Sequence, residues 1–324
     1  MNEVVVFGAI AFAGGAFGAS IGALNAFAFT GFVVVAGEVV NIVQRNLGHD
    51  FVNITQDVGF GVFFGPHVAF AGGAGALAYA AKRGYLTRDG EDAYHPAKNV
   101  VEGLGARPDV LAVGGVFGVV GYAFAETSVF FSAPYDPVAA GVVVSAFAHR
   151  AALGYSIVGD ASLRHRDGAE TWLPYQSSVA GVTFLGASVG VLGGYTAYVT
   201  GSAFLAFGLS TATLALMCAG TEKIPVTHHI TLPASTAVVA LTGVSSGIVP
   251  VETVRQVTLA EVVLVGAAFG VIGALFGELA QRVLYAGAET HLDPPAASIV
   301  LTTFVIAVFA LVGVLPSAGW VPLP

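Results

Sequence analysis

Long apolar runs recur along this chain, and they limit what it can fold into. One reads GGVFGVVGYAFAE (Gly114 to Glu126) and another reads VGAAFGVIGALFGE (Val265 to Glu278). Runs of about 20 such residues are long enough to cross a hydrocarbon core of about 30 Å as a helix. With 56% hydrophobic and only 10% charged residues, and a mean hydropathy of +0.81, the 324-residue chain lies outside the range of soluble proteins. We therefore predict an all-α, polytopic protein of the cell membrane.

The same two runs share one spacing of glycines and end on the same acid. The residues that align, at a constant spacing, are Gly114, Gly118, Gly121, Phe124 and Glu126 with Gly266, Gly270, Gly273, Phe276 and Glu278. Asp136-Pro137 and Asp293-Pro294 follow in the same order. Self-similarity of this extent indicates a duplication. We predict one transmembrane repeat over residues 1–158, a cytoplasmic linker over 159–177 and a second repeat over 178–324.

Each repeat is predicted to hold five spans, giving about ten transmembrane helices. The predicted spans lie near residues 4–24, 27–43, 59–82, 110–131, 137–157, 178–199, 202–218, 227–248, 259–283 and 295–314. An odd number of spans per repeat inverts the second repeat relative to the first. The spans that carry His67 and His228 are candidates for broken or re-entrant helices. If they are re-entrant, each repeat has four crossings and the repeats are parallel, so both topologies stay open here.

Charge orients the chain and excludes some partners. Two connections, 82–109 and 158–177, hold most of the basic residues, including Arg88, Arg164 and Arg166. The positive-inside rule places such connections in the cytoplasm. Because 20 acids outnumber 12 bases overall, we expect membrane lipids as neighbours but no nucleic acid as a partner.

Two histidine segments are the strongest candidates for a substrate site. FFGPHVAFAGG contains Pro66 and His67, and IPVTHHITLPAST occupies the corresponding place in the second repeat. Proline and glycine interrupt helical hydrogen bonding, and free backbone at membrane depth is tolerated only inside protein or beside water. The predicted substrate-binding residues are Pro66, His67, Thr227, His228, His229, Thr231 and Ser235. The alternative is that these histidines simply lie at the membrane interface, next to loops.

Carboxylates inside apolar runs are candidates for proton or cation coupling. Glu126 and Glu278 occupy the same place in the two repeats, and Glu38 lies on one helix face with Asn41. The alternative is that Glu126 and Glu278 reach the interface from helix ends, where exposure costs little. Arg150, a base within an apolar run, is a candidate partner for Glu126.

Sequence motifs for catalysis, nucleotide binding and metal binding are not found in this chain. The chain has no Walker motif, dinucleotide fingerprint or HExxH motif, so we expect no enzyme activity and no cofactor. Cys218 is the single cysteine, and adjacent histidines without a third ligand rarely hold a metal, so no disulfide or metal site is predicted. Glycines at every third or fourth position are typical of close helix packing in membranes.

The segments GPHVAFAGG, RPDVLAVGGVFGVVG and DPVAAGVVVSAFAHR resemble a poorly characterised, permease-like family of multispanning prokaryotic membrane proteins, over roughly residues 58–158. This resemblance implies no substrate and no functional residues. The acidic, small-residue composition resembles that of proteins from salt-loving archaea. In architecture alone, a five-plus-five duplication with related histidines is similar to the trimeric ammonium and urea channels, although their signature residues are not recognisable here.

The sequence therefore favours a membrane transport protein, expected to be a homo-oligomer. A small solute or ion would pass through a site at the interface of two inverted repeats. As a proton- or cation-coupled carrier it would use Glu126, Glu278 or Glu38, whereas in a channel these acids would be structural. The alternative function is a structural or partner-binding oligomeric membrane protein without transport activity.

Overall fold

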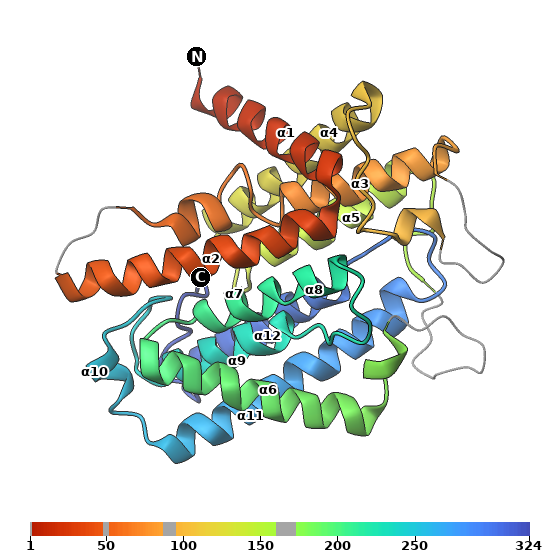
Figure 1. The fold of residues 1–324 in the computed structure, drawn as a ribbon. Helices are drawn as coiled ribbons and strands as arrows, with labels where there is room; N and C mark the ends of the chain where they lie inside the picture. Colours follow the sequence, from red (N-terminus) through yellow and green to blue (C-terminus); the bar gives the residue numbers. More distant parts are fainter. Residues whose placement is uncertain (1, 48–51, 87–94, 160–172) are drawn as a thin grey trace.

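The computed structural model describes residues 2–47, 52–86, 95–159 and 173–324 (Figure 1). Most of the predicted linker 159–177, together with Arg88, Arg164 and Arg166, lies outside these ranges. The helices are α1 (Glu3–Ile21), α2 (Ala23–Leu47), η1 (Thr55–Gly59), α3 (Ala69–Lys82), η2 (Pro96–Lys98), α4 (Pro108–Phe130), α5 (Pro137–Leu153), η3 (Pro174–Gln176), α6 (Val179–Thr200), α7 (Leu205–Ala212), α8 (Leu214–Cys218), α9 (His228–Ala240), α10 (Val251–Val254), α11 (Leu259–Ala280), η4 (Gln281–Tyr285) and α12 (Pro294–Leu311).

Six of the described helices are long and apolar enough to cross a membrane: α1, α2, α4, α6, α12 and α11 with its extension η4. Each offers at least 18 residues with few charges. At about 1.5 Å per residue, such a helix approaches or exceeds the thickness of the hydrocarbon core. By length and composition, this is an all-helical, multi-pass membrane protein.

The remaining predicted spans are shorter or broken. The segment 59–82 is helical only from Ala69, because Gly61, Gly65 and Pro66 lie in a chain of turns. Its counterpart α9 has 13 residues and α3 has 14, which gives helices of only about 20 Å. The segment 202–218 divides into α7 and α8, and α5 has 17 residues. In the described part of the chain, six helices are long enough to be full spans, so ten spans are not confirmed.

Side chains at the helix starts explain where several helices begin. Asp136 and Asp293 accept hydrogen bonds from backbone N–H groups of α5 and α12, and each precedes a proline in the first turn. Thr258 and Glu261 form a capping box at the start of α11. Such caps satisfy N–H groups that have no partner within the helix. The two Asp-Pro pairs thus mark the starts of α5 and α12.

The glycine patterns bring two pairs of helices into backbone contact. In the first half, Gly15 of α1 lies against Gly114 and Gly118 of α4. In the second half, Gly190 of α6 lies against Gly266 and Gly270 of α11 in the same way. A Cβ atom at any of these positions would overlap the opposing backbone, so only glycine permits this approach. The repeated glycines thus form the contact between the helices of each pair, and we call each such contact a glycine seam.

The short helices α3 and α9 lie inside these two bundles. Every residue of α9 and most residues of α3 are buried. Helix α3 packs on α1, α2, α4 and α5, and α9 packs correspondingly on α6, α7, α11 and α12. The carbonyl group of His67 faces Gly121, and that of His229 faces Gly273. His67 and His229 therefore occupy equivalent places, as do Pro66 and His228.

The two halves meet through α2 with α7 and α5 with α12 (Figure 1). Gly31 of α2 lies against Thr211 and Ala212, while Gly208 of α7 lies against Val34 and Val35. Because the later residues of one helix meet the earlier residues of the other, α2 and α7 run antiparallel. The N–H of Asp136, at the start of α5, donates to Thr303 Oγ1 (2.9 Å), well along α12, so these helices are antiparallel too.

Candidate functional site

A narrow cavity lies between the two halves, and we call it the central cavity. Its volume is about 30 Å³. It is lined by equivalent pairs from the two halves: Asp136 and Asp293, Ala139 and Ala296, Val142 and Ile299, Pro66 and His228, and Phe70 and Leu232. Phe27, Phe60, Val138 and Phe207 complete its wall. The cavity therefore has a carboxylate from each half and an otherwise largely apolar, aromatic lining.

The two aspartates of the central cavity are held by their helices. Asp136 Oδ1 accepts from the N–H groups of Val138 (2.8 Å) and Ala139 (3.1 Å). Asp293 Oδ2 accepts from the N–H of Ala296 (2.9 Å), and its Oδ1 lies 3.5 Å from His291 Nε2. Helix N-termini stabilise such carboxylates through the same N–H groups and the helix dipole. Both acids are fixed in place without a lysine or arginine partner at these distances.

A large cavity, which we call the first mouth, adjoins the central cavity. Its volume is about 580 Å³, and it shares Phe60, Asp136, Val138 and Leu232 with the central cavity. Three carboxylates line it, from Asp57, Glu126 and Asp136, together with His67. Its aromatic lining residues are Phe7, Phe60, Tyr122, Phe204 and Trp320. No lysine or arginine is among the described residues that line it, so the first mouth is acidic.

A much smaller cavity, the second mouth, lies at the C-terminal end of α11. Its volume is about 20 Å³, and His229, Gly277, Glu278 and Gln281 line it. Leu173 and Gln176, which precede α6, also line it. Glu278 Oε1 accepts a hydrogen bond from Arg282 Nε at 2.6 Å. This carboxylate is thus paired within its own helix end.

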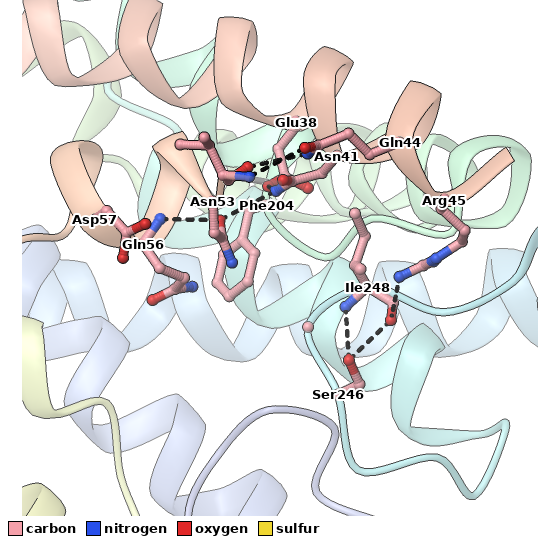
Figure 2. Close-up of a pocket in the computed structure, with 12 residues that line it drawn as sticks. Glu38, Asn41, Gln44, Arg45, Asn53, Gln56, Asp57, Phe204, Ser246 and Ile248 are labelled. Atoms are coloured by element: carbon pink, nitrogen blue, oxygen red, sulfur yellow. Dashed lines mark hydrogen bonds between the residues drawn. The ribbon is translucent and has the colours of Figure 1, made fainter. Parts of the chain in front are cut away.

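Glu38 lies at the edge of a further cavity of about 440 Å³ (Figure 2). Its carboxylate is buried and accepts from Asn41 Nδ2 (2.9 Å) and Thr55 Oγ1 (2.7 Å). Ser202 Oγ, from the second half, donates to its other oxygen. Asn41 and Glu38 thus share a helix face as predicted. Because Ser202 also caps the start of α7, Glu38 ties α2 to the second half.

The buried hydrogen bonds of Arg150 were not predicted from the sequence. Arg150 is fully buried and donates to Thr290 Oγ1 (3.0 Å) and to the carbonyl oxygens of Ile157 (2.8 Å), Leu284 (2.9 Å) and Thr290 (2.8 Å). The predicted pairing with Glu126 is therefore wrong. Arg150 holds the segment that leads to His291 and Asp293 at the central cavity. The polar run from Glu289 to Asp293, directly before α12, was the available signal.

The predicted substrate residues are distributed over three cavities. Pro66 and His228 line the central cavity, His67 the first mouth and His229 the second. All three histidines are at most 3% exposed, so they lie inside the protein. Thr231 Oγ1 bonds to Ser210 Oγ (2.8 Å) and Ser235 Oγ donates to Ala203 O (2.6 Å), which joins α9 to the segment around α7. Thr227 is buried at the start of α9.

Comparison with known proteins gives one family and no relative of known function. No curated protein and no solved structure matches the chain. A model described as a family of unknown function, DUF7973, matches it twice, over residues 2–167 and 160–324. Each half thus resembles the same family unit, and together the two matches cover nearly the whole chain. The chain belongs to the family of unknown function DUF7973.

Proposed function

We propose that this protein passes a small solute or ion across the membrane through the central cavity, at the interface of two inverted five-helix repeats. The observation that carries the proposal is the lining of that cavity by equivalent residues from both halves, with Asp136 and Asp293 among them. A carboxylate at membrane depth is costly and usually faces a cavity or an ion pathway. Two of them at equivalent positions are hard to explain by packing alone.

The antiparallel contacts between the halves support the inverted arrangement. Since α2 is long enough to cross the membrane and α7 runs antiparallel to it, a two-fold axis that relates them would lie in the membrane plane. Four crossings per repeat, with parallel repeats, would not give these contacts. In this arrangement α3 and α9 are half-length helices whose non-helical neighbours are covered by protein, as broken transporter helices are.

The central cavity is narrow in the present conformation. A volume of about 30 Å³ has room for about two water molecules. The structure therefore represents a closed state of the proposed pathway, with the wide first mouth adjoining the narrow central cavity.

Flux into sealed proteoliposomes tests this proposal. We expect the wild type to move protons or monovalent cations under an imposed salt gradient, followed with an internal pH dye and with tracer cations. Asp136→Asn and Asp293→Asn should reduce the flux at least about tenfold, because each removes a charge from the cavity while asparagine still caps a helix as well as aspartate. Glu126→Gln and Glu278→Gln show whether either mouth acid couples proton movement.

The outcome separates the two functions. Silent wild-type vesicles, with properly folded protein and with neutral solutes also excluded, would overturn the proposal and leave a structural membrane protein. Flux that both aspartate variants retain in full would show that transport does not use the central cavity.

A further inference from the structure

The first and second mouths are built from equivalent residues. The members that correspond are Phe7 and Val182, His67 and His229, Tyr122 and Ala274, Ala125 and Gly277, Glu126 and Glu278, and Val129 and Gln281. The equivalence follows from the packing already described, since Gly118 corresponds to Gly270 and the His67 carbonyl to that of His229. The two mouths are therefore two copies of one feature, although their volumes are about 580 and 20 Å³.

The copies differ in what lies one turn beyond the glutamate. In the second mouth that position is Arg282, whose guanidinium binds Glu278 at 2.6 Å. The ion pair is largely covered, with 12% of the Glu278 and 21% of the Arg282 side chain exposed. In the first mouth the equivalent position is Phe130, which points outward and is 81% exposed. Glu126 thus has no arginine or lysine where Glu278 has one.

The residues that line the first mouth indicate which kind of ligand could bind beside Glu126. Carboxylates of Glu126 and Asp57 attract a cation, and aromatic faces bind organic ammonium groups by cation–π attraction. His67 lines the same cavity and is 3% exposed. Its Nδ1 is covered by Gly65, whereas its Nε2 makes no hydrogen bond with the described residues. A neutral imidazole nitrogen of this kind can accept from an N–H group.

We infer that the first mouth is a site for a protonated amine, and that in the second copy of this feature Arg282 supplies the cation that pairs with Glu278. The first copy, around Glu126 and His67, is open to an external ligand. This inference rests on the proposed function, since it assigns the substrate class of the same pathway. Small inorganic cations share the charge but gain less from the aromatic faces.

Methylammonium binding to purified protein in detergent tests the inference. Trp320 lines the first mouth and packs on Phe204, so its fluorescence reports on this site. The chain has two tryptophans, and Trp172→Phe leaves Trp320 as the single reporter. The titration is made at constant ionic strength with sodium as the balancing cation, and calorimetry repeats it without relying on the indole.

We expect saturable methylammonium binding in the parent protein. Glu126→Gln should weaken it at least about tenfold, because a charge-assisted hydrogen bond is lost. Phe130→Arg should weaken it similarly by supplying a tethered cation to the first mouth. Glu222→Gln, which removes an exposed acid outside both mouths, is the charge-matched control and should bind as the parent does.

Absence of saturable binding, or unchanged binding in folded Glu126→Gln and Phe130→Arg proteins, would overturn the inference. Binding that follows the expected pattern in a protein that transports nothing would keep the amine site and reject the proposed function. Transport that depends on Asp136, in a protein that does not bind methylammonium, would keep the proposed function and reject the amine site.

Discussion

The two halves of the molecule agree where their glycines pack and differ where their cavities open. Gly15 and Gly118 meet in the first half as Gly190 and Gly270 meet in the second. The cavities at the ends of α4 and α11, in contrast, differ in volume from about 580 to about 20 Å³. The two halves thus share their helix packing but differ in the volumes of their mouths. We attribute this difference in volume to the residues that line each mouth. Each prediction below changes one side chain or one shared seam.

Arg150 is the strongest local difference between the halves, because Ala307 stands at the equivalent place in α12. We expect Arg150→Met to lower the free energy of unfolding by at least about 3 kcal/mol, since four hydrogen bonds to a charged donor are lost and their acceptors stay buried. Thermal unfolding in detergent measures the loss. Arg83→Met, at an exposed position, is the control and should change stability little. Equal melting temperatures would mean that Arg150 does not hold the 284–290 segment.

The glycine seams should respond alike in both halves. Gly118→Val and Gly270→Val each place a Cβ within 3 Å of an opposing Cα, at 2.8 Å from Gly15 and 2.6 Å from Gly190. We expect each to destabilise the protein by about 1–3 kcal/mol or more, seen as a lower melting temperature. Gly8→Ala, where nothing lies within 4 Å, should be tolerated. A large effect in one half only would break the equivalence of the two seams.

The bond from Glu38 to the second half has no counterpart in the opposite sense, because Ala215 occupies the position equivalent to Glu38. Glu38→Gln should cost about 1.5 kcal/mol, since three donors lose a charged acceptor. The same melting assay checks this, with exposed Glu102→Gln as the matched control. If Glu38→Gln instead leaves stability unchanged and alters ion flux, Glu38 acts in transport and not in joining the halves.

The ion pair of the second mouth should affect access more than stability. Arg282→Phe is expected to lower the free energy of unfolding by about 1 kcal/mol, because Glu278 loses a charged hydrogen-bond donor in a pair that is largely covered. A cysteine at Gln281, in a Cys218→Ser background, should then react several-fold faster with a water-soluble maleimide. The equivalent cysteine at Val129 in the first mouth is the reference and should react at the same rate with or without Arg282. No gain at position 281 would show that Leu173 and Gln176 keep the mouth closed by themselves.

Several features could be predicted from the sequence because they depend on neighbouring residues. The Asp-Pro pairs start α5 and α12, and Asn41 reaches Glu38 from three residues away. Other features were missed. The equivalence of Gly31 in α2 and Gly208 in α7, for example, appears only from their contacts with the opposing helix. Two glycine-rich sequences can be aligned in more than one register. Only the contacts with the opposing helix show which residues are structurally equivalent.

The sequence by itself determined that the chain resides in a membrane, that its two halves are related and where many helices begin. These follow from composition, from spacing and from side chains that bond to their own backbone. The tertiary structure decided that α3 and α9 are short and buried, that Arg150 bonds to backbone and not to Glu126, and that one mouth is wide and the other narrow. Those outcomes depend on which distant segments pack together, because cavity volume and charge pairing are properties of several elements at once.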